Sequence, residues 1–317
     1  MFPSNVRILA ARDSLGGTLA TPPDLPYFDF LLANLADRNA SLAKSFGRHV
    51  HWGYWADPAR ATCDDDDYAA AAEQLSREVC RAAEVAEGER VLDAGCGFGG
   101  TIALLNEQFS RLRLDGLNID ERQLERARRD VVARRDNVIQ FTRADACSLP
   151  FPDASFDRVL AVECIFHFPS RERFFAEVFR VLRPGGTLTL TDFVPAAPFV
   201  RLVRLATESP ALARYQFFGR VNLDCSRPYY RQIARRTGLL PVERRNLTRH
   251  ILPTYRYLVD VLRRSKSVEG IIQPIPDAAP WLAWAGRLGV LRYELLSFRK
   301  PDQDNPKPGL RSRHLWT

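Results

Sequence analysis

A glycine-rich turn with an acidic residue at its entrance follows a short apolar run near residue 90. Residues 90–100 read Arg-Val-Leu-Asp-Ala-Gly-Cys-Gly-Phe-Gly-Gly. The apolar residues indicate the end of a buried strand, and glycine lets the backbone turn tightly into a helix that we expect to begin near Thr101. A ligand can therefore approach the main chain beside Asp93. Gly95, Gly97 and Gly100 also fit the G-x-G-x-x-G pattern of nucleotide-binding turns, so the segment predicts a nucleoside site.

Polar residues after the next two predicted strands indicate which kind of nucleotide is bound. A dinucleotide-binding fold places an acidic residue about 20 positions after the glycines, at the tip of the second strand. This chain has Asn118 at that tip and Asp120 two residues later, and Asp145 and Ala146 follow a third strand. Asparagine can still bond a ribose hydroxyl through its carbonyl oxygen. Asn118 thus stands where a dinucleotide-binding fold would have an acidic residue.

A histidine and an aspartate that follow later strands are candidates for proton transfer. His167 comes shortly after a fourth strand, and Asp192 ends a fifth. The carboxyl ends of parallel strands meet at the edge where open α/β sheets bind their ligands. An imidazole titrates near neutral pH, so His167 is a suitable general base, with Asp192 orienting it. In the alternative, His167 is a hydrogen-bonded residue that only shapes the pocket.

A short segment before the glycine turn is unusually rich in rings. Residues 49–55 read His-Val-His-Trp-Gly-Tyr-Trp. We expect Tyr54 to lie over the cofactor and Trp55 to contact the substrate, since an aromatic face stabilises a nearby cation. Ordinary packing of these rings against the sheet is the alternative. We do not expect His49 and His51 to bind a metal ion, because no third ligand is evident.

Further aromatic residues lie in the second half of the chain. Tyr229 and Tyr230 follow Arg-Pro, and Tyr255 stands in the run Leu-Pro-Thr-Tyr-Arg-Tyr. These residues fall where an acceptor pocket would form, and their rings favour a flat or lipophilic substrate. The alternative is that the three tyrosines pack a lid against the core.

Apolar periodicity places the candidate residues on strands that alternate with helices. A first strand is expected to end near residue 92, and further strands to span 112–118, 138–142, 157–163, 187–193 and 292–298. Apolar residues at helical spacing predict helices at 27–36, 68–86, 121–134, 171–182, 198–217, 228–236 and 255–264. Strands that alternate with helices in this way form a parallel, doubly wound sheet.

The predicted elements divide the chain into four parts. We expect residues 1–88 to form an N-terminal helical cap and residues 89–195 to form the core that binds the nucleoside. Residues 196–300 would hold a lid over the acceptor together with the last strands of the same core, because this span is too long for a simple connection. The tail at 301–317 is rich in proline and charge, so we expect it to be disordered.

The composition is that of a globular protein, with 46% hydrophobic and 26% charged residues among 317. We find neither an apolar window long enough to span a bilayer nor a basic leader segment, and we expect a cytoplasmic protein. The six cysteines lack C-x-x-C spacing, which argues against a zinc site or disulfide framework. The net charge of +7 comes mainly from arginine. A basic protein can recruit nucleic acid, but these arginines stand beside acids along predicted helices, as on solvated helix faces.

Several motifs, in their order along the chain, resemble those of the class I S-adenosylmethionine-dependent methyltransferases. The matching segments are Asp93-x-Gly95-x-Gly97, Asp145-Ala146, Glu163-x-x-x-His167-x-Pro169, the Arg-Val-Leu-Arg-Pro-Gly-Gly run at 180–186, and Asp192-Phe193. Within that family the chain looks like the small-molecule, natural-product type, a group akin to the tocopherol, sarcosine and sugar O-methyltransferases. Asn118 departs from the family's commonest acidic residue.

This resemblance implies a fold, a cofactor and roles for individual residues. The fold would be α/β, a doubly wound Rossmann-like sheet of seven mostly parallel strands, with an N-terminal helical cap and a helical insertion between strands five and six. His167 and Asp192 would be catalytic, as residues at these positions are thought to be in some members. The cofactor would be S-adenosylmethionine, bound by Tyr54, Asp93, Gly95, Gly97, Asn118, Ile119, Gln123, Asp145, Ala146 and Glu163.

The favoured hypothesis is an S-adenosylmethionine-dependent methyltransferase that acts on a small molecule, such as a secondary metabolite, by in-line displacement. The identity of the acceptor, the atom methylated (O, N or C) and the oligomeric state are left open. An RNA or DNA methyltransferase is the main alternative, but the chain lacks an Asn/Asp-Pro-Pro-Tyr motif, a Pro-Cys nucleophile and a separate basic module. A cofactor-binding protein without activity and a nicotinamide dehydrogenase are less favoured, because the motif residues are intact and no second nucleotide-binding half follows.

Overall fold

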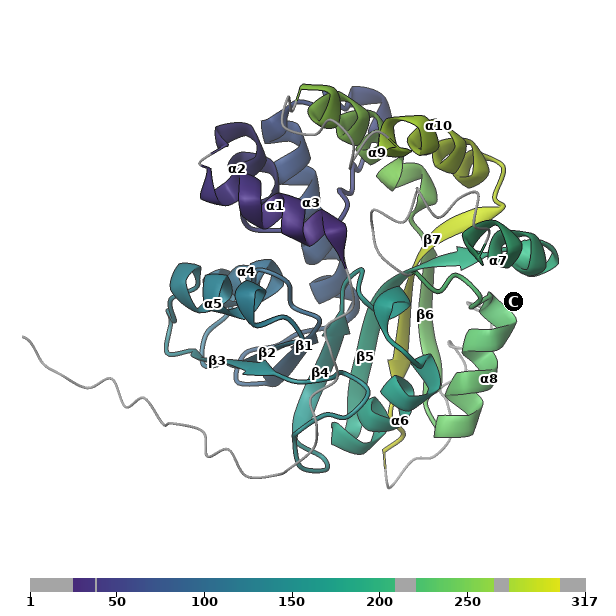
Figure 1. Ribbon diagram of the computed structural model, residues 1–317. Helices are drawn as coiled ribbons and strands as arrows, with labels where there is room; N and C mark the ends of the chain where they lie inside the picture. Colours follow the sequence, from purple (N-terminus) through teal and green to yellow (C-terminus); the bar gives the residue numbers. More distant parts are fainter. Residues whose placement is uncertain (1–24, 38, 209–220, 265–273, 303–317) are drawn as a thin grey trace, which may run out of the picture.

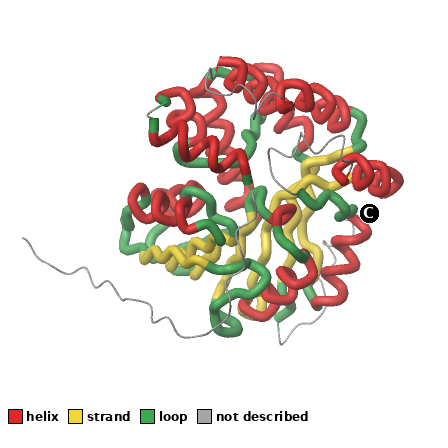
Figure 2. The backbone as a smooth tube through the Cα atoms, in the orientation of Figure 1, coloured by secondary structure: helices red, strands yellow, loops and turns green. Residues whose placement is uncertain are grey.

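Seven strands form one sheet at the centre of the computed structural model, which describes residues 25–37, 39–208, 221–264 and 274–302. The strand order is β3-β2-β1-β4-β5-β7-β6 (Figures 1 and 2). Strands β1 to β5 run parallel, and β7 is antiparallel to both β5 and β6. The prediction of a seven-stranded, mostly parallel Rossmann-like sheet is therefore confirmed. The strands are β1 (Arg90–Ala94), β2 (Arg113–Asn118), β3 (Val138–Arg143), β4 (Phe156–Ala161), β5 (Leu182–Pro195), β6 (Leu240–Asn246) and β7 (Leu291–Arg299).

Helices cover the sheet and gather above the carboxyl ends of its parallel strands (Figure 1). Within the described residues, none of them combines the length and apolar character that a bilayer span requires. The helices are α1 (Pro26–Ala36), α2 (Ala40–Phe46), α3 (Asp65–Ala82), α4 (Gly100–Gln108), α5 (Glu121–Asp130), α6 (Arg171–Val181), α7 (Val200–Glu208), α8 (Arg227–Thr237), α9 (Thr248–Arg264) and α10 (Pro274–Arg287), with short 3₁₀ turns η1 (Pro58–Arg60), η2 (Ile165–His167) and η3 (Ala197–Phe199).

Two apolar clusters hold the helices on the sheet. In one, Phe175 of α6 and Ile233 of α8 pack with residues of β4 and β5. In the other, Leu75 of α3 and Leu105 of α4 pack with residues of β1, β2 and β7. These four side chains are at most 1% exposed. Burial of both faces explains why the central parallel strands β1, β4 and β5 carry apolar runs and were recognisable in the sequence.

A helical cap lies over the carboxyl edge of the sheet and combines segments from distant parts of the chain. Leu42 of α2 and Tyr68 of α3 share a third apolar cluster with Tyr257 and Val261 of α9. The rings of Tyr68 and Tyr257 stack with their centroids 4.1 Å apart. Sequence analysis placed the N-terminal cap and the later insertion in separate parts. The structure joins them, because the apolar stripe of α9 at helical spacing packs against α2 and α3.

The region after β5 contains a strand whose position sequence analysis did not identify. β6 separates two helical segments, α7 with α8 before it and α9 with α10 after it. Its sequence, Leu-Pro-Val-Glu-Arg-Arg-Asn, has charged residues in place of an apolar run. Such a sequence is possible because β6 is the edge strand, where charged side chains and Pro241 are tolerated.

Several predicted boundaries also move. Helix α9 begins at Thr248 and not at 255, and α3 spans Asp65–Ala82 and not 68–86. Helix α5 ends at Asp130, short of the predicted 134. The side chain of Asn106 hydrogen-bonds the backbone that follows the helix. It donates to the Val132 carbonyl at 2.8 Å and accepts from the Arg134 amide at 2.9 Å. Strand β5 begins at Leu182, before the predicted 187, and its pairing with β4 shifts register there. Residues 209–217 of the predicted 198–217 helix, and most of the predicted disordered tail, lie outside the described residues.

Candidate active site

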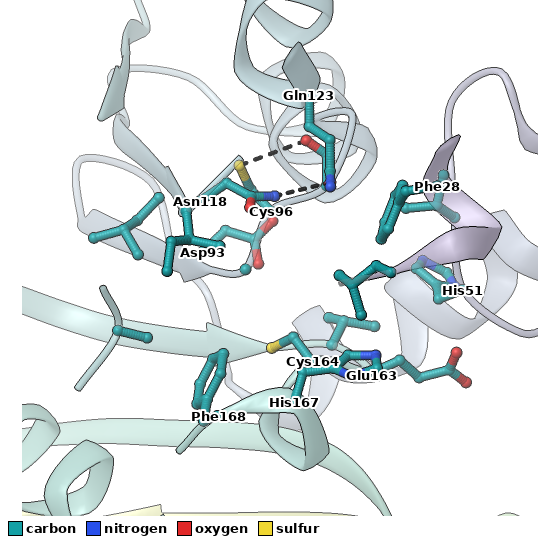
Figure 3. A pocket seen from close by; sticks show the side chains of 18 of the residues that line it. Phe28, His51, Asp93, Cys96, Asn118, Gln123, Glu163, Cys164, His167 and Phe168 are labelled. Carbon is teal, nitrogen blue, oxygen red and sulfur yellow. Dashed lines mark hydrogen bonds between the residues drawn. The ribbon is translucent and has the colours of Figure 1, made fainter. Parts of the chain in front are cut away.

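A cavity of about 490 Å³ opens at the carboxyl ends of β1 to β4. Asp93 lies near the end of β1 and Asn118 at the end of β2, while Asp145 and Glu163 follow β3 and β4. Figure 3 shows Asp93, Cys96, Asn118 and Gln123 facing a second wall formed by Cys164, His167 and Phe168. The predicted site residues that line the cavity are Asp93, Gly95, Gly97, Asn118, Ile119, Gln123, Asp145, Ala146, Glu163 and His167.

The glycine turn forms one wall of this cavity. Gly95 has φ of +83°, in the left-handed region that favours glycine. A Cβ atom at Gly95 would lie 2.6 Å from the Cβ and 2.8 Å from the Sγ of Cys164. The amides of Gly95 and Cys96 both donate to the carbonyl of Leu117, at 2.7 and 3.0 Å. The turn is therefore fixed between β2 and the loop after β4, and it exposes its main chain to the cavity.

Asp93 gives the cavity a buried acidic group. The residue is 2% exposed, and burial raises the pKa of its carboxyl to about 7. No basic side chain in the described part of the chain forms an ion pair with it. Burial disfavours the ionised form of a carboxyl group unless a cation pairs with it. Asp93 is therefore suited to a ligand that carries an ammonium or sulfonium group.

Asn118 and Gln123 form an oriented amide pair beside Asp93. The Nδ2 atom of Asn118 donates to the Oε1 atom of Gln123 at 3.0 Å, and its Oδ1 atom accepts from the Asp120 amide at 3.1 Å. Both side chains line the cavity. The remaining amide hydrogens and oxygen lone pairs can bond hydroxyl groups. Asp145 lies further along the same edge, where its Oδ1 atom accepts from the Cys147 amide at 2.8 Å.

The loop after β4 carries Glu163 in a strained backbone conformation. Its φ of +50° lies in the left-handed region, which is unfavourable for a residue with a Cβ atom. The Oε2 atom accepts from the Trp52 amide at 2.9 Å, and the carboxylate turns away from Asp93 (Figure 3). Burial raises the pKa of Glu163 to about 8. The side chain therefore ties the segment at 49–55 to the loop that carries Cys164 and His167.

His167 ends the short turn η2 and faces the cavity between two rings. Its imidazole stacks on Tyr27, with centroids 6.2 Å apart and planes inclined by 21°. It also meets Phe166 edge-on, with centroids 4.5 Å apart. Its backbone amide donates to the Cys164 carbonyl at 2.9 Å. The ring is thus held opposite the glycine turn, at a place where a group of the substrate can reach it.

Several lining residues were missed by sequence analysis because they come from segments outside the parallel strands and their loops. Tyr27 and Phe28 begin α1, and the ring of Phe28 lies 6.0 Å from that of Phe98 beside the glycine turn. Arg48 and Asn222 also line the cavity. The adjacent aromatic pair at the start of the predicted helix 27–36 was the available signal. Its direction in space depends on packing between segments far apart in the sequence.

The two histidines of the segment at 49–55 support the cavity wall. His49 Nε2 bonds Glu73 Oε2 at 2.7 Å, and His51 Nε2 bonds Ser76 Oγ at 3.0 Å. Burial lowers the pKa of His49 and lowers that of His51 to about 3, so His51 is neutral at physiological pH. In the part of the chain that the structure describes, no cluster of three or more histidine, cysteine or acidic residues could hold a metal ion.

The structure places Tyr54 and Trp55, which were predicted to contact the cofactor and the substrate, outside the cavity. The Tyr54 amide donates to the Ala71 carbonyl at 2.8 Å, and its ring stacks on His250 at 4.6 Å. Trp55 is buried, and its Nε1 atom donates to Asp67 at 2.9 Å. Backbone bonds to α3 and α9 hold this stretch within the cap, where its rings pack against neighbouring side chains.

The remaining predicted contacts, Asp192, Tyr229, Tyr230 and Tyr255, also lie away from the cavity. Tyr255 is buried with its ring 4.4 Å from that of Trp52, and Tyr229 packs on the core beside α6. Asp192 is fully buried and pairs with Arg171 at 2.9 Å and with the hydroxyl of Tyr230. The expected pairing of Asp192 with His167 is corrected, because a buried carboxylate takes the nearest cation and donors.

Comparisons with known proteins agree with the geometry of this site. A family profile described as a methyltransferase domain matches residues 92–190. The chain is 38% identical over 157 residues to the methyltransferase GfsG of Streptomyces halstedii, covering 49% of this chain and 55% of that protein. It is 32% identical over 272 residues to the 27-O-demethylrifamycin SV methyltransferase of Amycolatopsis mediterranei, covering 82% of this chain and 93% of that protein. The fold resembles the crystal structure of the [4+2]-cyclase SpnF, with a TM-score of 0.67 at 21% identity, covering 89% of this chain and 98% of that one.

Proposed function

This chain belongs to the small-molecule S-adenosylmethionine-dependent methyltransferases, and from that premise we propose that it methylates a hydroxyl oxygen of a natural product, with His167 as general base. Membership of this family supports the reaction class. Relatives whose names give small-molecule substrates, such as rifamycin and erythromycin, leave the alternative of a nucleic-acid substrate without support. The choice of oxygen follows the name of the rifamycin relative, which assigns that protein an O-linked methyl group.

The single observation that supports the donor site is the series of polar groups along successive strand ends. In our proposal Asp93 pairs with the positive methionine end of S-adenosylmethionine, Asn118 and Gln123 bond its ribose, and Asp145 bonds its adenine. The burial that raises the pKa of Asp93 to about 7 would be offset by the ligand's positive charge. A cavity of about 490 Å³ lies within the usual range for sites that bind small ligands.

When bound, S-adenosylmethionine supplies a methyl group on a positively charged sulfur, which a nucleophile displaces in line. The chain must hold the acceptor on the far side of that methyl group and exclude water. His167 lies across the cavity from the glycine turn, and in our proposal its imidazole takes the proton of the acceptor hydroxyl. Tyr27 and Phe166 limit the rotation of the ring, so its orientation is set before the acceptor arrives.

A screen for methylated products tests this proposal. The purified protein is incubated with S-adenosylmethionine and with hydroxylated macrocyclic, aromatic and sugar-bearing compounds, and products are identified by mass spectrometry. We expect an O-methyl product that His167→Ala forms far more slowly. Methylation confined to amine or carbon acceptors would contradict the choice of oxygen, and a full rate in His167→Ala would contradict the base.

A further inference from the structure

A buried ion pair between α6 and β5 lies directly behind the wall that carries His167. Arg171 is the first residue of α6, and its Nη2 atom lies 2.9 Å from the Oδ2 atom of Asp192. The two side chains are 1% and 0% exposed. A cation at the N-terminus of a helix opposes the helix dipole, and a buried charge is tolerated only with a partner. Arg171 therefore occupies this position at a cost in electrostatic free energy, and its other contacts indicate what the residue does there.

The oxygens of Asp192 are already engaged within this group. Oδ2 accepts from Arg171 and from the hydroxyl of Tyr230, and Oδ1 accepts from the Phe193 amide at 2.8 Å. The Nε–H group of Arg171 also donates to the Tyr230 hydroxyl oxygen at 3.1 Å. Helix α8, which carries Tyr230, is thereby joined to α6 and β5 through a single carboxylate.

A further bond carries this network to the cavity. The Nη2 atom of Arg171 donates to the carbonyl oxygen of Asn222 at 2.8 Å, and the amide of Asn222 donates to the carbonyl of Phe166 at 2.9 Å. Asn222, Phe166 and His167 all line the cavity. The guanidinium group therefore holds the backbone at Asn222, and Asn222 in turn holds the turn that ends in His167.

We propose that Arg171 is a positioning residue for methyl transfer: fixed by Asp192 and Tyr230, it places Asn222 and the Phe166–His167 turn so that the acceptor meets the donor in line. Asp192 thus acts through Arg171 and not by orienting His167. The inference rests on the proposed function, since it assigns the wall around His167 to the acceptor. Arginine fits this task because its planar fork can bond a carboxylate and a carbonyl at once.

A first test needs no acceptor. Arg171→Lys keeps the charge but cannot make the same set of bonds, and Arg173→Lys on the exposed side of α6 is the matched control. Hydrogen exchange is measured by NMR at the Asn222 amide, with the Leu92 amide of β1 reporting global unfolding. We expect exchange at Asn222 to be about fivefold faster or more in Arg171→Lys and unchanged in Arg173→Lys. Unchanged exchange at Asn222 would overturn the inference.

A kinetic test uses whichever acceptor the product screen identifies. We expect Arg171→Lys to lower kcat/KM for the acceptor by about 10- to 100-fold through misplacement, with the dissociation constant of S-adenosylhomocysteine within about twofold of the wild type. Loss of S-adenosylhomocysteine binding in the wild type would instead refute the proposed function. If Arg171→Lys does not fold, Tyr230→Phe must show the same pattern at smaller amplitude, with Tyr229→Phe as its control.

A double-mutant cycle separates the two possible routes from Asp192. If Asp192 acts through Arg171, the effects of Asp192→Asn and Arg171→Lys on kcat/KM are not additive. The acidic limb of the pH dependence of kcat/KM then stays in place in Asp192→Asn. A shifted limb, or effects of Asp192→Asn and Arg171→Lys that add, would return Asp192 to the role of a histidine partner and overturn the inference.

Discussion

The imidazole of His167 stacks on the phenol ring of Tyr27, with centroids 6.2 Å apart and planes inclined by 21°. The two residues come from the loop after β4 and from the first cap helix, α1, and both line the cavity. The candidate base is therefore oriented by a residue of the cap. The contact therefore links the first cap helix to the candidate base.

Tyr27→Ala tests this coupling. We expect the variant to lower kcat and to weaken S-adenosylhomocysteine binding by about two- to tenfold, because a ring contact contributes about 0.5 to 1.5 kcal/mol beyond its buried area. Tyr27→Phe keeps the ring and is the matched control. Calorimetry and steady-state kinetics measure the two effects, and normal values for both in Tyr27→Ala would show that the stacking is incidental.

His167→Ala tests the base itself. We expect turnover to fall by about 100-fold or more, since a positioned general base contributes that much, with donor affinity little changed. The variant should also lose the acidic limb of the pH dependence of kcat. Full activity in His167→Ala would make the residue one that only shapes the pocket.

Gly95→Ala tests whether ligand binding needs the geometry of the glycine turn. Gly95 has φ of +83° and a Cβ there would lie 2.6 Å from Cys164, whereas Gly88 has φ of +77° and open space around it. Gly88→Ala is therefore a matched control that carries the backbone strain alone, at about 1 to 2 kcal/mol. We expect S-adenosylhomocysteine affinity to fall more than about tenfold in Gly95→Ala only. Equal affinities in the two variants would exclude a ligand at the turn.

The ionisation of Asp93 predicts how donor binding depends on pH. Burial raises the pKa of its carboxyl to about 7 in the empty site, so the residue is increasingly protonated below that pH. If the ligand's positive charge requires the ionised form, affinity for S-adenosylhomocysteine falls as pH drops below about 7 and levels off above it. Asp93→Asn should bind weakly with little pH dependence in this range. Calorimetry from about pH 5.5 to about 8.5 measures the affinity of both proteins. The same pH dependence of affinity in the wild type and in Asp93→Asn would show that Asp93 does not bind the ligand.

The raised pKa of Glu163 predicts that the stability of the ligand-free protein depends on pH. Its pKa is about 8 in the folded chain, against an ordinary value of 4.5. Between these values the folded state holds a proton that the unfolded state releases, so the contribution to stability is complete below 4.5 and is lost as pH rises through about 8. We expect the melting temperature to fall over this range less steeply in Glu163→Gln than in Glu172→Gln, the control on α6. Identical slopes would contradict the assignment.

Much of the site could be predicted because its residues follow local rules. Asp93, Asn118 and Asp145 come at or just after strand ends, and short motifs fix their spacing to the glycine turn. Strands that are buried on both faces can also be recognised in the sequence by their apolar runs. The edge strand β6 could not be recognised in this way, because Pro241 and the charged residues that follow it form no apolar pattern.

The unpredicted features depend on contacts between distant segments. Tyr27 reaches the cavity only because α1 folds over the sheet, and Arg171 meets Asn222 across 51 positions of sequence. Tyr54 and Trp55 were placed at the ligands from their chemistry, but bonds to α3 and α9 hold them within the cap. Which way a ring faces is set by tertiary packing, and neither composition nor periodicity records it.

The most direct test of the account is isothermal titration of the purified protein with S-adenosylhomocysteine and, separately, with NAD. We predict that S-adenosylhomocysteine binds with a dissociation constant on the order of micromolar and that NAD does not bind. Binding of NAD, or of neither ligand, would contradict the assignment of the cavity to a methyl donor.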